Sequence, residues 1–333
     1  MIKTKKLRDL INGNKVVIAP CAYDALSARA IEFMGFELAA TTGFGMHGTM
    51  LGVPDNGLLT FTEMVRMCRN MASSINIPMM ADAEGGYGNA INTYRTIKEF
   101  ENSGLAGLFI EDQELPPNCP YIKGTRLIRV QEMIGKIKAA LEARKDKNFV
   151  IVARTDAPFE EAVERLNAYY EAGVDMVKPM PRSRKELEDY PKYLKAPIHL
   201  GFTYGKEITL GLTATDCGKM GYKIVTFPFS ELMASTTAIL RILKEIKEKE
   251  LSEEEISSLI NLGKKDILIA LTREQKLSSA QIKDMLPNAP YLAVCLLVEK
   301  QDISEVMAEI LEKIKPHPEI YKELIAKYKG VKW

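Results

Sequence analysis

Short runs of β-forming residues alternate with longer segments of helical spacing over the first 250 residues of the chain. The runs predict strands at 15–20, 37–42, 77–83, 107–112, 149–155, 175–179, 197–201 and 222–228. The segments between them predict helices at 24–35, 60–72, 90–104 and 158–173. Strands that are apolar almost throughout, alternating with helices, indicate a parallel sheet that helices cover on both faces.

The number of these units favours a (β/α)8 barrel. Eight strand–helix units over about 230 residues match this fold, which usually takes about 250 residues. A doubly wound open sheet is the competing arrangement. After a long helical segment at 230–250 the pattern becomes all-helical, so we predict a barrel domain at 1–250 and a helical C-terminal region at 251–333. An apolar stretch at 288–298 suggests that this region packs on something, such as a neighbouring subunit.

The composition gives no sign of a nucleic-acid or membrane partner. The 333 residues carry a formal net charge of +1, without the basic excess that polyanions attract. No stretch approaches the ~20 apolar residues of a membrane span, and the N-terminus lacks the apolar core of a signal peptide. Five cysteines without CxxC pairs or metal spacing suit a reducing cytoplasm. Only three histidines are present, which argues against a zinc site or a histidine-centred triad.

Acidic residues follow several of the predicted strands. Asp82 and Glu84 come directly after an apolar run, Glu111 ends the next strand, and Asp55 lies in the loop after the second strand. In a barrel these strand ends meet at one rim, where carboxylates repel one another unless a cation neutralises them. Oxygen ligands with few histidines favour Mg²⁺. The alternative is that each acid caps the following helix, but four acids together favour a metal site.

Glycines are placed where a ligand could approach the chain. Those at positions 85, 86 and 88 are expected to let the backbone turn and to leave room for a ligand behind the acids. The segment 41–57 is expected to be a glycine-rich turn, in which the amides of Thr42, Gly43 and Phe44 could form an anion-binding nest.

Arg154 follows the fifth predicted strand. Its guanidinium could contact a carboxylate or phosphate through two hydrogen bonds. It could instead form a structural ion pair with Asp156 or Glu111.

Six separated motifs resemble the isocitrate lyase/phosphoenolpyruvate mutase superfamily in order and spacing, over residues 10–245. They are PCAYDALSARAIEFMGF, TTGFGMHGTMLGVPDNGLLT, ADAEGGYGN, FIEDQ, VARTDA and GYKIVTFPFS. The resemblance implies a (β/α)8 barrel whose eighth helix is exchanged between subunits, in a homodimer or homotetramer. It also implies that Mg²⁺ or Mn²⁺ holds a 2-oxo or 2-hydroxy acid, in which a bond at the adjacent carbon is made or broken through an enolate.

The resemblance also implies roles for single residues. Asp82 matches the direct metal ligand, while Asp55, Glu84 and Glu111 match carboxylates that hold metal-bound waters; Glu84 stands where Asp is usual. The remaining matches concern the substrate: Thr42, Gly43 and Phe44 would grip its carboxylate and enolate oxygen, and Arg154 would reach its pyruvyl group.

The match breaks in the catalytic loop, EDQELPPNCPYIKG. Cys119 is in register with the catalytic cysteine of the lyases, but Pro117 and Asn118 replace a basic pair, and Pro120 and Tyr121 replace Gly-His. Without neighbouring cations, the thiol of Cys119 should stay closer to an ordinary thiol.

The residues that would contact the second half of the substrate also differ. Met180 stands where lyases have a Glu, and Thr203 is kept although its neighbours change. Lys178, Arg182 and Arg184 could favour a more anionic group; Lys178 could instead be a barrel-core residue neutralised by a nearby acid.

The preferred hypothesis is a Mg²⁺-dependent carbon–carbon lyase that cleaves a branched 2-hydroxy di- or tricarboxylate, such as 2-methylisocitrate, to pyruvate or a related 2-oxo acid. Tyr23 or a metal-linked carboxylate such as Glu111 would be the base, Cys119 the acid, and Arg182 and Thr203 further substrate contacts. Oxaloacetate decarboxylation or carbon–phosphorus chemistry on a phosphonopyruvate-like acid is the alternative. A non-catalytic 2-oxo-acid-binding protein is the second alternative.

Overall fold

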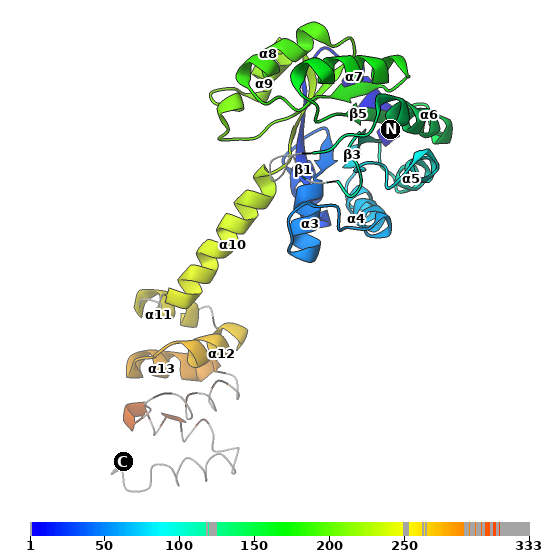
Figure 1. Cartoon of the computed structure of the whole chain (residues 1–333). Coiled ribbons are helices and arrows are strands. Elements are labelled where there is room, and N and C mark those ends of the chain that lie inside the picture. The colour runs from blue at the N-terminus through cyan, green and yellow to red at the C-terminus, as the bar shows by residue number, and fades with distance from the viewer. Residues whose placement is uncertain are drawn as a thin grey trace. The chain divides into compact units, whose positions relative to one another are not determined.

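Eight parallel strands close into a barrel, in which each strand pairs with the next and β8 pairs with β1 (Figure 1). In this computed structural model the strands are β1 Val17–Ala22, β2 Ala39–Thr41, β3 Met79–Asp82, β4 Gly107–Glu111, β5 Val150–Arg154, β6 Met176–Lys178, β7 Ile198–Gly201 and β8 Tyr222–Phe227. The predicted (β/α)8 fold is confirmed and the open sheet is wrong. Every predicted strand overlaps an observed one, and the first is shifted by two residues.

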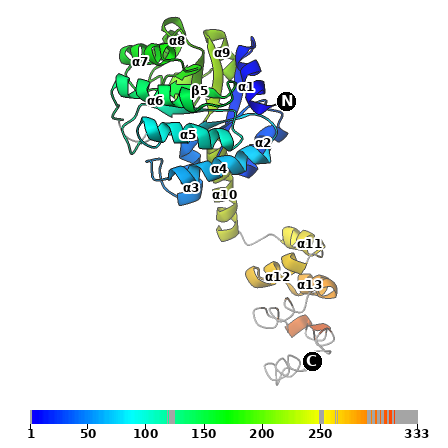
Figure 2. The same cartoon turned by 90° about the vertical axis from the view of Figure 1, so that its right-hand side faces the viewer.

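Helices surround the barrel on the outside (Figure 2). They are α1 Lys3–Asn12, α2 Ala25–Phe33, α3 Gly43–Leu51, α4 Phe61–Ser74, α5 Ala90–Asn102, α6 Val130–Ala143, α7 Phe159–Glu171, α8 Arg184–Tyr193 and α9 Ala214–Met220, with a short 3₁₀ helix at Glu207–Thr209. The four helices predicted between strands correspond to α2, α4, α5 and α7. Polar side chains fix where several begin: Thr60 and Glu63 form a capping box at α4.

The apolar core has two layers in the barrel unit. One lies between the strands and the surrounding helices, and includes Phe100 and Ile137. The other fills the barrel interior, where Met80 and Val152 pack in one cluster with Leu7 of α1. This filling leaves the C-terminal ends of the strands as the place where side chains can line a cavity.

The structure describes residues 2–117, 119, 125–248, 253–261, 263, 265–289, 293, 297, 301, 304–306, 309–310 and 313. The chain divides into two compact units, Met1–Thr237 and Ala238–Trp333, and the division falls inside α10 Ser230–Glu248. The predicted domain boundary after residue 250 stays a prediction.

Helices are the only regular secondary structure among the described residues of the second unit. It contains α11 Glu253–Asn261, α12 Lys265–Glu274 and α13 Ser279–Met285, with 3₁₀ helices at Leu286–Asn288 and Ser304–Val306. Leu268, Ile282 and Met285 are fully buried in a core of its own. Among the described helices of both units, none combines the length and the apolar character needed to cross a membrane.

Candidate active site

A cavity of about 700 Å³, counted to its open mouth, lies at the C-terminal ends of the barrel strands. The charged residues that line it come from the ends of β3, β4, β5 and β6 and from the segments after β2 and β3: Asp55, Asp82, Glu84, Glu111, Arg154 and Lys178. The four acids predicted from the sequence are therefore brought together, as the barrel topology requires.

Three of these carboxylates converge on one point beside Gly43. A Cβ atom on Gly43 would lie 3.1 Å from Glu84 Oε1, 3.2 Å from Asp82 Oδ2 and 3.6 Å from Asp55 Oδ2. A side chain at position 43 would therefore occupy the space in which these oxygens meet. Glycine leaves this space open.

The four acids do not cap helices, which was the alternative interpretation. The helices that follow them begin at other residues: Thr60 caps α4, Asn89 caps α5 and Arg129 precedes α6. Within the turn after β3, Asp82 Oδ1 accepts a hydrogen bond from the amide of Glu84 at 3.0 Å, which leaves its other oxygen facing Gly43.

The cavity carboxylates are buried close to one another, so their ionised forms are unfavourable. Burial, followed by repulsion from Asp82, raises the pKa of Asp55 to about 6 and that of Glu84 well above its ordinary value. Burial also raises the pKa of Glu111 to about 8, although the guanidinium of Arg154 opposes this shift. A divalent cation would remove both causes, because it replaces lost solvation and screens the repulsion.

The acids fit a hard divalent cation. Glu84 Oε1 is buried and has no hydrogen-bond partner in the described part of the chain. Carboxylate oxygens are the donors that Mg²⁺ prefers. Asp55, Asp82 and Glu84 are therefore the residues that would hold the ion, with Glu111 beside them.

His47 also comes close to this cluster, since single donor atoms of His47, Asp55 and Glu84 lie within 4.8 Å of one another. Both ring nitrogens are already used, however. Nδ1 donates to the Gly43 carbonyl at 2.9 Å, and Nε2 accepts from the Leu59 amide at 3.2 Å. His47 therefore fixes the position of Gly43, and it does not line the cavity.

The glycines behind the acids serve the backbone and not the ligand, which corrects one expectation. Gly86 has φ of 75°, and a Cβ atom there would lie 2.7 Å from Thr93 Oγ1 in α5. Glu84 itself has φ of 50°, in the left-handed region that non-glycine residues seldom adopt. The glycine that faces the ligand space is Gly43.

The segment 41–57 is not the glycine-rich turn that we expected. Residues 43–51 of this segment form helix α3, which Thr42 caps by accepting a hydrogen bond from the Gly45 amide at 3.3 Å. The amides of Gly43 and Phe44 have no acceptor among the described residues. The predicted anion-binding amides are thus the first turn of a helix, whose N-terminus favours a negative charge.

Arg154 forms both of the ion pairs that were considered as alternatives to substrate binding. Its Nη1 lies 2.9 Å from Glu111 Oε2, and its Nε and Nη2 contact the two oxygens of Asp156 at 3.1 and 3.0 Å. Arg154 nevertheless lines the cavity. Its position is therefore fixed on both sides before any ligand binds.

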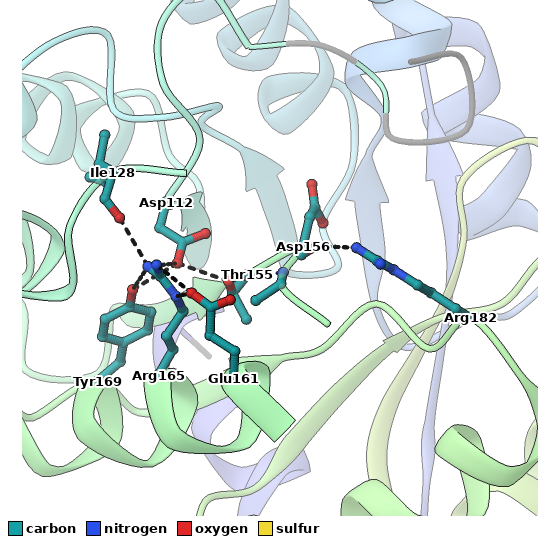
Figure 3. Close-up of polar contacts among 9 residues, drawn as sticks. Asp112, Ile128, Thr155, Asp156, Glu161, Arg165, Tyr169 and Arg182 are labelled. Atoms are coloured by element: carbon teal, nitrogen blue, oxygen red, sulfur yellow. Dashed lines mark hydrogen bonds and ion pairs between the residues drawn. The ribbon is translucent and has the colours of Figure 1, made fainter. Parts of the chain in front are cut away.

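A buried polar network lies behind this arginine (Figure 3). Asp112 Oδ2 accepts hydrogen bonds from Tyr169 at 2.7 Å, Thr155 at 2.8 Å and Arg165 at 3.2 Å. Asp112 follows Glu111, and Thr155 follows Arg154, so the network joins the ends of β4 and β5 from outside the barrel. This network could not be predicted from the sequence, because nothing in the spacing connects residue 112 with residues 165 and 169.

Cys119 lines the cavity and is 6% exposed. Its amide donates to the Asp55 carbonyl at 3.0 Å, which connects the catalytic-loop segment to the loop that carries a proposed metal ligand. Asn118, Pro120 and Tyr121 lie outside the described residues.

Three predicted site residues do not line the cavity. Tyr23 is buried with its Cβ against Gly45. Thr203 lines a smaller neighbouring cavity, and Arg182 donates to the Asp156 carbonyl at 2.7 Å, as Figure 3 shows. Three other residues that were predicted to contact the substrate do line the cavity: Thr42, Gly43 and Phe44.

Several known proteins are similar to this chain in sequence. The phosphoenolpyruvate phosphomutase family model matches residues 7–247. A 2,3-dimethylmalate lyase of Eubacterium barkeri is 33% identical over 80% of this chain and 94% of its own. A 2-methylisocitrate lyase of Aeropyrum pernix is 39% identical over 73% and 79%. An oxaloacetate decarboxylase of Rhodopseudomonas palustris is 40% identical over 60% and 70%.

Solved structures of the same superfamily are also similar to this chain. Oxaloacetate acetylhydrolase in complex with 3,3-difluorooxalacetate has a TM-score of 0.71, at 29% identity over 76% of this chain and 88% of that one. Phosphonopyruvate hydrolase in complex with oxalate and Mg²⁺ has a TM-score of 0.67, at 27% identity over 81% and 98%. With a family match that covers most of its length, the chain belongs to the isocitrate lyase/phosphoenolpyruvate mutase superfamily.

Proposed function

We propose that this chain is a Mg²⁺-dependent carbon–carbon lyase, which cleaves a branched 2-hydroxy di- or tricarboxylate to pyruvate or a related 2-oxo acid. The observation that carries the proposal is the convergence of Asp55, Asp82 and Glu84 on the space beside Gly43. The first two amides of α3, which have no acceptor among the described residues, lie next to this space. The relatives named as 2-methylisocitrate and 2,3-dimethylmalate lyases support carbon–carbon cleavage as the reaction class. Mn²⁺ would suit the same oxygen ligands.

The proposal divides the work between the ion and the chain. When bound, Mg²⁺ would supply positive charge to the oxygens of the substrate and stabilise negative charge that develops there. The amides of Gly43 and Phe44 would bind the substrate carboxylate, as donors fixed before binding contribute most to catalysis. Arg154, held by Glu111 and Asp156, would orient the same end of the substrate.

Two residues at the cavity wall are candidates for proton transfer. Glu111 lines the cavity next to the guanidinium of Arg154, and, as a carboxylate that this guanidinium and the bound cation keep ionised, it would accept the hydroxyl proton of a substrate. Cys119 lies in the loop beside Asp55 and could donate a proton to the departing carbon. Tyr23 has no part in this scheme, because it does not line the cavity.

Two other functions have support of their own. The oxaloacetate decarboxylase relative favours decarboxylation or carbon–phosphorus chemistry as the alternative. Met180, which lines the cavity at a position where lyases have a Glu, also favours this alternative. The replaced residues around Cys119 favour a non-catalytic 2-oxo-acid-binding protein as the second alternative.

The test is incubation of the purified chain with Mg²⁺ and a panel of acids, with pyruvate release as the readout. We expect release from 2-methylisocitrate or dimethylmalate and none without the metal. Release from oxaloacetate or phosphonopyruvate alone would favour the alternative. Oxalate binding without any turnover would favour the binding protein.

The Cys119→Ser variant tests the proposed acid in the same assay. A serine hydroxyl is a much weaker acid than a thiol, so we expect turnover to fall about 10–100-fold. Calorimetric titration with oxalate should give a dissociation constant within about twofold of that of the unchanged chain. Equal turnover in both proteins would remove the cysteine from the mechanism.

We also propose that the protein is a homodimer or homotetramer in the cytoplasm. Helix α10 exposes a run of large apolar side chains, at Ile239, Leu240, Ile242, Leu243 and Ile246, which is typical of a surface that another subunit covers. Four buried cysteines form no disulfide in the described part of the chain, which suits a reducing compartment: Cys21, Cys68, Cys119 and Cys217. Light scattering of the purified protein would give the oligomeric state.

A further inference from the structure

Lys178 is a buried cation that forms no hydrogen bond or ion pair with the described residues. It ends β6, is 7% exposed and lines the cavity. No hydrogen bond or ion pair of its Nζ is found within the described residues, and the nearest feature is the ring of Phe109, whose centroid lies 3.6 Å away. Buried lysines are normally paired, so its three donors are available to a ligand.

The other cation of the cavity is in the opposite situation. Arg154 is held by Glu111 and by both oxygens of Asp156. Arg182, which the sequence suggested as a substrate contact, donates to a backbone carbonyl outside the cavity wall. Among the described residues that line the cavity, Lys178 is therefore the cation with no carboxylate within ion-pair distance.

The position of Lys178 separates it from the metal-binding side. The proposed ligands come from the segments after β2 and β3, whereas Lys178 comes from β6, which lies across an eight-stranded ring from β2. The other side chains of that wall are uncharged, and include Met180 and Thr226. If the 2-oxygenated carboxylate of a ligand is bound at Gly43, the far end of that ligand would thus reach the ammonium group of Lys178.

We propose that Lys178 binds the second carboxylate of the substrate and so selects diacids over monoacids. This inference rests on the proposed function and names the residue that would bind the second carboxylate of its substrate. A hydrogen bond between two charged groups is among the stronger polar contacts that a protein makes, so its loss should weaken diacid binding by about tenfold or more.

The test compares malate with lactate, because malate is lactate with its methyl group replaced by a carboxymethyl group. With Mg²⁺ present, we expect racemic malate to bind the unchanged chain at least about tenfold more tightly than racemic lactate. The Lys178→Met variant, of similar length, should lose this preference and keep its affinity for lactate and oxalate. Lys178→Arg should keep part of it, and Lys185→Met, which removes an exposed lysine of α8 and is the matched control, should keep all of it.

Each other outcome overturns a distinct statement. An unchanged malate preference in Lys178→Met, with oxalate binding intact, contradicts the inference alone. Equal weakening of malate, lactate and oxalate would mean that Lys178 acts on the shared 2-oxygenated end or on the fold, which also contradicts it. Tighter Mg²⁺ binding with an unchanged preference would make Lys178 a counter-ion of the acids. If the unchanged chain binds no oxalate with Mg²⁺, the proposed function fails first, and this inference with it.

Discussion

Glu111 and Asp112 are neighbours in sequence and yet lie in two different polar regions. Glu111 faces the cavity, where Asp55, Asp82 and Glu84 also gather. Asp112 faces the helices, where a hydroxyl, a phenol and a guanidinium donate to one of its oxygens (Figure 3). Successive side chains of a strand point to opposite faces, which is why one residue step separates the two regions.

The difference lies in what satisfies each carboxylate. Burial raises the pKa of both Glu111 and Asp112, but Asp112 is compensated by Tyr169, Thr155 and Arg165 of its own chain. In the cavity, Glu84 keeps a buried oxygen without any partner among the described residues. The other oxygen of Asp112 is also buried without a partner among the described residues, but the guanidinium of Arg165 compensates the charge of this carboxylate. No ion pair to Glu84 is found in the described part of the chain, so the cavity acids are arranged for a cation that those residues do not supply.

The largest expected effect comes from removing the central cavity acid. Asp82→Ala should lower turnover by at least about 10³-fold, the loss typical of a group that a catalytic charge depends on. Mg²⁺ titration should show the same loss. Asp284→Ala, which removes an exposed acid of α13, should leave both unchanged. Full turnover in Asp82→Ala would break the distinction between the two regions.

Asp112→Asn should damage stability and spare the ligand site. Arg165 would lose a charged partner, so the free energy of unfolding should fall by about 1–3 kcal/mol in denaturant titrations. Oxalate binding with Mg²⁺ should stay within about threefold. Asp189→Asn, which removes an ion pair on the surface of α8, should change stability by less than about 1 kcal/mol. A large loss of oxalate affinity in Asp112→Asn would show that the network also sets the site geometry.

Glu84→Gln should stabilise the metal-free protein, whereas Asp112→Asn should destabilise it. The amide removes a buried charge that Asp82 and Asp55 repel, so the free energy of unfolding should rise by about 1 kcal/mol, or roughly 2–4 °C in Tm. Mg²⁺ should bind more weakly than to the unchanged chain. A lower Tm without metal would mean that Glu84 is already satisfied in the folded chain.

The smallest effect is a dependence of Tm on pH. The pKa values of Asp55 and Glu111, about 6 and about 8, are higher in the folded chain than in an unfolded one, so the folded state binds more protons. This contribution to stability is present below about pH 4 and is lost as the pH rises toward 8. The increase in Tm on adding Mg²⁺ should therefore be larger at pH 8 than at pH 6. An equal increase at both values would contradict it.

The sequence by itself determined the barrel and the acids at its mouth. Apolar runs such as 149–155 and helical spacing such as 158–173 are local patterns, and a parallel sheet necessarily brings its strand ends to one rim. Asp55, Asp82, Glu84 and Glu111 could therefore be placed together without coordinates. The resemblance to a family added the first turn at Gly43 and Phe44.

Only the tertiary structure decided which side chains reach the cavity. The sequence predicted that three more residues belong to the site, but in the folded chain their side chains do not line the cavity: Tyr23, Thr203 and Arg182. The partners of Asp112 and the isolation of Lys178 depend on residues far along the chain, because a side chain's contacts follow from its direction and neighbours in space. Sequence spacing carries neither.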